Sequence, residues 1–169
     1  MNFIIGRSPD LNLRNLKFVG SFFPKDPVAL HDLLDSFDPE ISHKNAVTQA
    51  PPIAIIAPHA GYQFSGKLAA AAYASCGPQR PERIVILSPS HRCRFHGIAV
   101  AGYQAYDVAG QVLPLDEDLR RDLISRGWVQ HHDAAHEDEH GIETQLPFIS
   151  LHCKGARVLP LVIGNTTPQ

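Results

Sequence analysis

The sequence lacks three features that would place it in a specialised class of protein. No stretch approaches the about 20 apolar residues of a membrane-spanning helix, and residues 1–10 have no long apolar core after a basic start. Lysine and arginine number 15 against 17 acidic residues, which gives no electrostatic reason to bind nucleic acid or an anionic membrane. The three cysteines have neither an even count nor a zinc-ribbon spacing. We therefore expect free thiols, a cytoplasmic location, and small molecules or proteins as partners.

The composition that remains is that of an ordinary globular protein. Of the 169 residues, 44% are hydrophobic and 19% are charged, and no repeat or change in composition marks a second domain. We expect a single domain over residues 1–169. The unusual feature is the presence of ten histidines, several of them clustered between His131 and His140. Such clustering makes metal chemistry worth testing.

The first half of the sequence predicts a strand, a helix and a second strand in succession. Asp26 and Pro27 have the character of an N-cap and a first helical residue, and apolar residues recur with helical spacing as far as Phe37. Polar residues 38–52 follow as a loop. Residues 53–57 and 84–87 are short apolar runs typical of buried strands, and alanine-rich residues 66–75 between them predict a helix. This order indicates a parallel pair of strands with a helical crossover.

The second half predicts further elements of both kinds. Its apolar patterns indicate strands at residues 97–101, 106–112 and 158–163, and helices at residues 116–125 and 141–152. Strands and helices thus alternate along most of the chain. We expect an α/β fold with a largely parallel or mixed central sheet that is flanked by helices.

Two histidines directly follow the two predicted buried strands. His59 lies in the run Ala-Pro-His and His91 in the run Ser-Pro-Ser-His. Ligands bind beyond the carboxyl ends of parallel strands, so adjacent strands would bring both imidazoles to one edge. Two neutral imidazoles can share a cation, although at least one further donor is expected. The alternative is that each histidine only ends a strand and bonds to a loop carbonyl.

The motifs around these histidines resemble those of the Memo family, whose prokaryotic members are also called AmmeMemoRadiSam system protein B. The resemblance extends from about residue 19 to residue 164 and covers GSFFP at residues 20–24, APHAGY at 57–62, SPSH at 88–91, HEDEHGIE at 136–143 and LPF at 146–148. It implies a fold similar to that of class III extradiol ring-cleaving dioxygenases. It also implies that His59 and His91 bind a metal, with iron or copper as the expected ion and zinc left open.

The resemblance further implies that the family's remaining site residues lie outside this sequence. They are an aspartate, a histidine and a late cysteine ligand, all in a C-terminal portion that these 169 residues do not include. We therefore expect a C-terminally truncated Memo-like domain. Near His59 and His91, the residues Tyr62, Ser65 and Ser90 are candidates to line the pocket, and Ser65 could instead cap the following helix.

Residues 136–143 allow two functional interpretations. The run from His136 to His140 fits H-x-x-E-H, in which two histidines one turn apart bind zinc and the glutamate activates water, but Gly141 interrupts the helix that this site requires. A purely structural alternative is that Asp138 and Glu139 lie before or in the first turn of a helix, where the helix dipole favours carboxylates. The family resemblance adds that His140 and Glu143 line the pocket of His59 and His91, with a catalytic role in proton transfer or support of the metal.

Two functions from different classes follow. The first is a metal-dependent redox protein related to non-haem iron dioxygenases. The second is a non-catalytic module whose crevice binds a small molecule, a peptide or a protein. The prokaryotic family name implies a radical SAM protein and an AMMECR-like protein as partners. A separate physical expectation is an incomplete sheet, whose open strand edge would promote dimer formation or aggregation.

Overall fold

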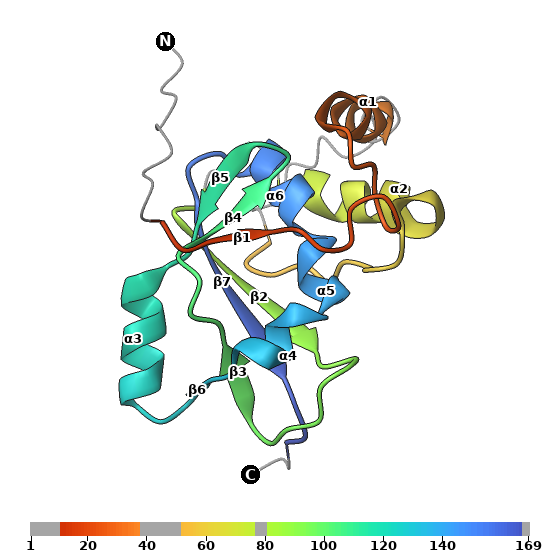
Figure 1. Cartoon of the computed structure of the whole chain (residues 1–169). Helices are drawn as coiled ribbons and strands as arrows, with labels where there is room; N and C mark the ends of the chain where they lie inside the picture. The colour runs from red at the N-terminus through yellow and green to blue at the C-terminus, as the bar shows by residue number, and fades with distance from the viewer. Residues whose placement is uncertain (1–10, 38–51, 77–80, 167–169) are drawn as a thin grey trace.

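A computed structural model describes residues 11–37, 52–76 and 81–166 of the chain, shown in Figure 1. The helices and strands of these ranges are β1 (Leu13–Asn15), α1 (Pro27–Phe37), α2 (Tyr62–Ala74), β2 (Arg83–Pro89), β3 (Ile98–Val100), β4 (Ala105–Val108), β5 (Gln111–Pro114), α3 (Glu117–Ser125), β6 (Gln130–His131), α4 (Asp133–Glu137), α5 (His140–Glu143), α6 (Leu146–His152) and β7 (Arg157–Ile163). None of these helices has the length and apolar character needed to cross a membrane.

The strands form two sheets, and each sheet contains both parallel and antiparallel pairs. One sheet has the order β2-β7-β3-β6, and the other has the order β1-β4-β5. Strand β7 pairs in parallel with β2 over its whole length and antiparallel with β3. An isolated bridge between Leu115 and Val158 connects the second sheet to β7. The predicted α/β fold with a mixed sheet is therefore confirmed.

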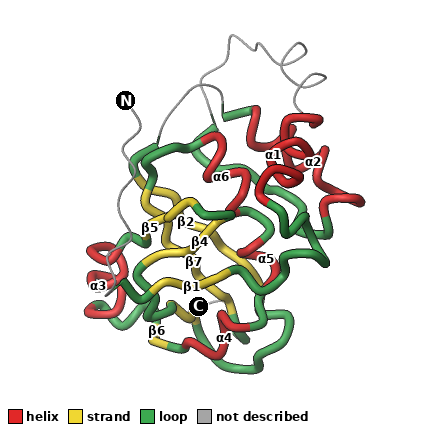
Figure 2. Tube along the Cα trace, turned by 45° about the horizontal axis from the view of Figure 1, so that its top comes forward, coloured by secondary structure: helices red, strands yellow, loops and turns green. Residues whose placement is uncertain are grey.

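Helices cover both faces of the sheet that contains β7. Val158 and Val162 of β7 face a core that also holds Ile149 of α6, whereas Leu159 and Leu161 face a second core that α3 covers. This alternation explains why the sequence of β7 is continuously apolar, because neither face of the strand meets solvent. Helices α1 and α2 lie on the opposite side of the molecule from α3 (Figures 1 and 2).

Two predicted helices form with the expected caps. Asp26 accepts a hydrogen bond from the amide of Ala29 at 2.9 Å, and α1 begins at Pro27. Asp116 accepts one from the amide of Leu119 at 3.0 Å, and α3 follows directly. Each carboxylate satisfies an amide of the first turn that has no partner within the helix. Local sequence signals were sufficient at these two positions.

The predicted parallel pair of residues 53–57 with residues 84–87 is wrong. Residues 53–57 form no strand, and the parallel partner of β2 is β7. A strand exists only through hydrogen bonds to a neighbour, and none of the hydrogen bonds between described residues involves the backbone of residues 53–57. The predicted loop at residues 38–52 lies outside the described residues except for its last position.

Two other predicted elements are each divided. The strand expected at residues 106–112 is a hairpin of β4 and β5, because Ala109 and Gly110 have φ angles of 53° and 86° and form its turn. The helix expected at residues 141–152 is divided into α5 and α6. Pro147 lies in the first turn of α6 and has no amide hydrogen to donate, so α5 cannot continue through it.

Candidate metal centre

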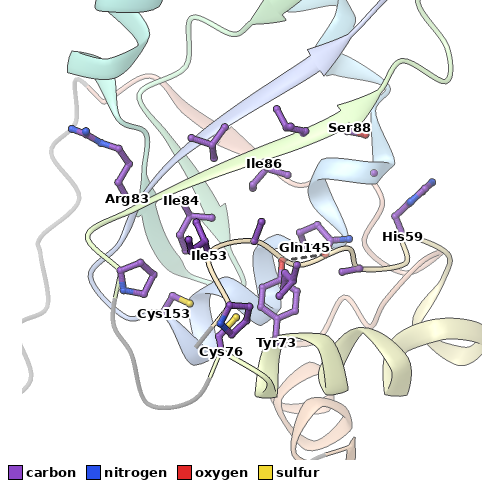
Figure 3. Close-up of a pocket in the computed structure, with 18 of the residues that line it drawn as sticks. Ile53, His59, Tyr73, Cys76, Arg83, Ile84, Ile86, Ser88, Gln145 and Cys153 are labelled. Atoms are coloured by element: carbon purple, nitrogen blue, oxygen red, sulfur yellow. Dashed lines mark hydrogen bonds between the residues drawn. The ribbon is translucent and has the colours of Figure 1, made fainter. Parts of the chain in front are cut away.

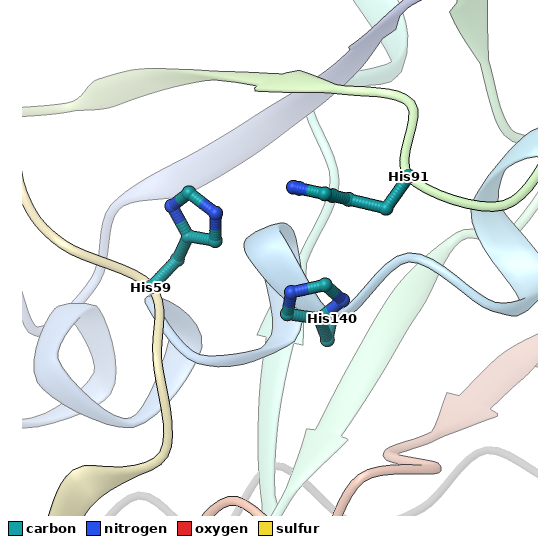
Figure 4. Close-up of side chains that lie close together, drawn as sticks. All are labelled: His59, His91 and His140. Carbon is teal, nitrogen blue, oxygen red and sulfur yellow. The ribbon is translucent and has the colours of Figure 1, made fainter. Parts of the chain in front are cut away.

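Three histidines from separate parts of the chain meet at one end of β2. Their rings lie around a common space (Figure 4), and one nitrogen from each side chain lies within 4.8 Å of the others. The ring centroids are 5.0 Å apart for His59 and His91, 5.6 Å for His59 and His140, and 4.4 Å for His91 and His140. The predicted meeting of His59 and His91 is therefore confirmed, and His140 joins them.

Each histidine is placed by a different local structure. His91 follows the carboxyl end of β2, and His140 is the first residue of α5. His59 precedes α2 in a segment without regular structure, which is held because Gln145 donates its side-chain amide to the carbonyl of Pro58 at 3.2 Å. The site thus depends on α5 and α6 as much as on the sheet.

Glu139 holds His91 in position, a role that no local sequence pattern indicates. The carboxylate is 1% exposed and accepts from Nδ1 of His91 at 2.8 Å and from its backbone amide at 2.9 Å. It also accepts from the amide of Gly141 at 2.8 Å. A carboxylate on Nδ1 keeps the proton there and leaves Nε2 of the neutral imidazole free to bind a metal.

The surroundings of His140 favour its unprotonated form. Burial and the neighbouring charge of His91 lower the pKa of His140. Burial alone would raise the pKa of Glu139, but the hydrogen bonds from the backbone amides of His91 and Gly141 lower it. A neutral His140 beside an ionised Glu139 suits the binding of a cation, because a protonated nitrogen has no lone pair to donate.

Aromatic residues from the N-terminal segment lie against His140. The rings of Phe18 and Phe22 have centroids 5.7 Å and 4.9 Å from that of His140. Phe22 belongs to the GSFFP motif, yet nothing in its local pattern indicated a contact about 120 residues away in the sequence. These rings form an apolar wall on one side of the histidines.

Glu143 was predicted to line the pocket, but its carboxylate is bound to residues 14–18, in the N-terminal segment of the described chain. It is 1% exposed and pairs with Arg14 at 2.9 Å, and it accepts from the amides of Lys17 and Phe18 at 2.7 Å and 3.0 Å. Burial raises the pKa of Glu143 in spite of these partners. Among the described residues, no hydrogen bond or ion pair joins Glu143 to the three histidines.

The predicted pocket residues Tyr62, Ser65 and Ser90 make contacts that stabilise the surrounding chain. The Tyr62 hydroxyl is buried and donates to the carbonyl of Thr144 at 2.8 Å. The Ser90 hydroxyl donates to the carbonyl of Cys93 at 2.5 Å in the loop that carries His91. The predicted cap by Ser65 is wrong, because α2 begins three residues earlier, at Tyr62, and the Ser65 hydroxyl donates to the carbonyl of Ala60 at 3.3 Å.

The zinc-protease interpretation of residues 136–140 is also wrong. α4 ends at Glu137, and Glu139 has an extended backbone, so the two histidines do not lie on one helix. His136 is 2% exposed, and its Nε2 is 3.1 Å from the carbonyl oxygen of Ala99. Among the residues that the structure describes, His136 is not part of a cluster of potential metal ligands.

A cavity of about 590 Å³ opens beside His59 and runs along β2 (Figure 3). Its lining is mainly apolar and includes Ile53, Tyr73 and Ile86. The Tyr73 hydroxyl is hydrogen-bonded to the side-chain oxygen of Gln145 at 3.1 Å at the polar end of this cavity. The space is large enough to hold a small organic molecule or several peptide residues.

Comparison with known proteins gives one consistent result. Residues 14–169 match a family model described as Memo-like protein. A MEMO1 family protein of Aquifex aeolicus is 32% identical over 157 residues, which cover 90% of this chain and 55% of that protein. Human protein MEMO1 is 30% identical over 156 residues, or 89% of this chain and 51% of that protein. The chain spans about half the length of the curated relatives that it matches.

Proposed function

Since the chain belongs to the Memo-like protein family, we propose that His59, His91 and His140 bind one transition-metal ion in a redox protein. The observation that supports this proposal is the meeting of three imidazole nitrogens within 4.8 Å of one another. Metal–nitrogen distances of about 2.1 Å limit two ligands of one ion to a separation of about 4.2 Å. Nitrogens that lie up to 4.8 Å apart would have to approach one another by about 0.6 Å or more to share an ion.

The donor set fits iron or copper and also accommodates zinc. Imidazole is a good ligand for all three metals, and the irons of non-haem oxygenases commonly have two histidine ligands. Glu139 supplies the carboxylate contact that metal-binding histidines usually make through their second nitrogen. A bound iron or copper ion would supply electron transfer and an open position for a substrate, because three protein ligands leave coordination positions free.

The protein residues around the histidines would control access to that position. The side chains of His91 and His140 are 29% and 16% exposed, so the cluster is reachable from solvent on one side. Phe18 and Phe22 exclude water from the side of His140. The apolar cavity beside His59 offers a place for a substrate that carries few charges.

The roles of His140 and Glu143 in proton transfer stay predictions. A nitrogen that binds the metal cannot also accept a proton, so ligation by His140 would leave its second nitrogen as the only site for transfer. Glu143 would act on His140 only if its carboxylate left Arg14 and the two backbone amides. We therefore propose His140 as a ligand and Glu143 as the residue that anchors the N-terminal segment beside it.

Elemental analysis of protein that carries no histidine tag tests the proposal. We expect about one equivalent of iron, copper or zinc per chain after loading, and a loss of at least tenfold in affinity when His59→Ala and His91→Ala are combined. His31→Ala is the matched control, because that histidine is 63% exposed on α1. Metal that stays at full occupancy in the double variant would reject this function.

The cavity beside His59 favours a second candidate, a binding module without turnover. Its apolar lining suits a small molecule or the side chains of a peptide, and partners of this kind include the radical SAM and AMMECR-like proteins expected from the resemblance. Copurification of such a partner with protein that binds no metal would favour this function over the redox function. A cytoplasmic location is expected in both cases and stays a prediction.

A further inference from the structure

Two of the three cysteines lie at one end of the cavity beside His59. Cys76 follows α2 and is partly buried, whereas Cys153 caps the carboxyl end of α6 and is 6% exposed. Both side chains line the cavity, and Figure 3 shows their sulfur atoms at the end that is remote from His59. All three cysteines are free thiols in the structure. The proposed metal site makes no use of this pair.

The packing of α2 on α6 explains why the two thiols meet. The ring of Tyr73 in α2 stacks on the rings of Phe148 and His152 in α6, with centroids 5.3 Å and 6.4 Å apart and interplanar angles of 10° and 13°. The amide of Cys76 donates to the carbonyl of Tyr73 at 3.1 Å, one turn earlier. Cys153 directly follows His152. The two helices therefore end beside each other, and each end carries a thiol.

The electrostatics of the pair agree with this placement. Burial raises the pKa of both thiols, and the neighbouring Cys76 raises the pKa of Cys153 further. Repulsion between two thiolates has this effect only where the sulfur atoms are near each other. Cys93, in the loop that follows β2, is not among the described residues that line the cavity. It is therefore a natural control for the reactivity of the pair.

We propose that Cys76 and Cys153 form a reversible disulfide between the ends of α2 and α6 when the chain meets a low-molecular-weight disulfide such as oxidised glutathione. Cys76 is the more exposed of the two thiols, so it reacts first. Its sulfur attacks one sulfur of the oxidant, the bond between the two glutathione sulfurs breaks, and a mixed disulfide forms as one glutathione leaves.

The second thiol completes the exchange. The sulfur of Cys153 attacks that of Cys76 in the mixed disulfide, and the second glutathione leaves. The two cysteines lose two electrons and two protons, which the two glutathione thiols gain, so the reaction is balanced without any other reagent. Thiols with raised pKa values exchange slowly at neutral pH, which suits a lasting response to oxidation better than rapid turnover.

The disulfide would fasten the interface that supports His59. The hydroxyl of Tyr73 is hydrogen-bonded to the side-chain oxygen of Gln145 at 3.1 Å, and the amide of Gln145 donates to the carbonyl of Pro58 at 3.2 Å. A bond that holds α2 on α6 therefore also restricts the segment that carries His59. An effect on metal affinity rests on the proposed function, whereas formation of the disulfide does not.

Redox equilibration of the full chain tests the pairing, in chelator so that metal plays no part. Samples in reduced and in oxidised glutathione are trapped with N-ethylmaleimide and digested, and their peptides are identified by mass spectrometry. We expect peptides joined through Cys76 and Cys153 in the oxidised sample and both thiols alkylated in the reduced one. This measurement uses the unaltered chain and remains valid if the histidines bind no metal.

Matched serine variants assign the effect to the pair. Cys93→Ser should form the disulfide to the same extent as the unaltered chain, and Cys76→Ser should lose it. Oxidation should raise the urea midpoint of the unaltered chain but not that of Cys76→Ser, because the bond restricts the unfolded chain. A disulfide that includes Cys93, a pair that only takes up glutathione, or a link that forms only in urea would each overturn the proposal.

Discussion

The change Glu139→Gln probes the histidine cluster without touching a proposed ligand. The carboxylate places one oxygen on Nδ1 of His91 and on the amide of Gly141, and the other oxygen on the amide of His91. Glutamine retains one of these oxygens and replaces the other with an NH2 group. Because the NH2 group is itself a donor, it could not accept a hydrogen bond where it replaces an oxygen. It would face either the backbone amide of His91 or, in the other orientation, Nδ1 of His91 and the amide of Gly141.

The size of the effect follows from these contacts. The substitution removes the charge that strengthens the bond to Nδ1 and leaves at least one buried donor without an acceptor, which costs about 1–3 kcal/mol of folding free energy. His91 would then be oriented less strictly. We expect the dissociation constant of the metal to rise about 10-fold to 100-fold, equivalent to about 1.4–2.7 kcal/mol.

Competition with a chromophoric chelator at neutral pH measures the dissociation constant, and urea unfolding measures the stability of the same samples. Glu137→Gln is the matched control, because the Glu137 side chain is exposed and makes no hydrogen bond or ion pair to another described residue; Arg14 bonds only to its backbone carbonyl. An unchanged metal affinity in Glu139→Gln would refute the argument that this carboxylate orients His91. A loss of equal size in Glu137→Gln would assign the effect to net charge instead.

Three further predictions concern the structure around the cluster. In Gly141→Ala the added Cβ would overlap Oγ of Ser88, and we expect metal affinity in the chelator assay to fall about tenfold as the loop shifts; unchanged affinity would show that it adapts. Arg14→Leu removes the partner of buried Glu143 and should lower the free energy of unfolding by about 3 kcal/mol in urea, and a neutral result would mean that the pair adds nothing. Burial lowers the pKa of His136 to about 4, so the unfolded chain binds more protons below about pH 6.5. Stability should therefore fall by about 1 kcal/mol from pH 7.0 to pH 5.5, which an unchanged urea midpoint would contradict.

The sequence predicted the meeting of His59 and His91 correctly, but for a reason that is partly wrong. The apolar pattern predicts residues 53–57 as a strand parallel to β2, whereas the parallel partner of β2 in the structure is β7. The histidines meet because the Pro58 carbonyl is bound to Gln145 and because His91 lies in the loop that follows β2. A short apolar run shows that a segment can be a strand, but not whether a neighbour exists to pair with it.

The contribution of Glu139 could not be predicted because it depends on a contact across 48 residues of sequence. Local patterns indicated a helix start at this position, and Glu139 does accept from the amide of Gly141 there. The same carboxylate also reaches His91, which only the packing of α5 against the end of β2 makes possible. Helix caps and helical periodicity depend on residues close together in the sequence and can be predicted from it. Contacts between distant segments cannot be predicted in this way.

The central claim is that one ion is bound jointly by His59, His91 and His140. Anomalous diffraction at the absorption edge of the loaded metal measures this directly in crystals of the untagged chain. The account predicts one peak with a nitrogen of each of the three imidazoles about 2.1 Å away. A peak elsewhere, or no peak in metal-saturated crystals, would contradict it.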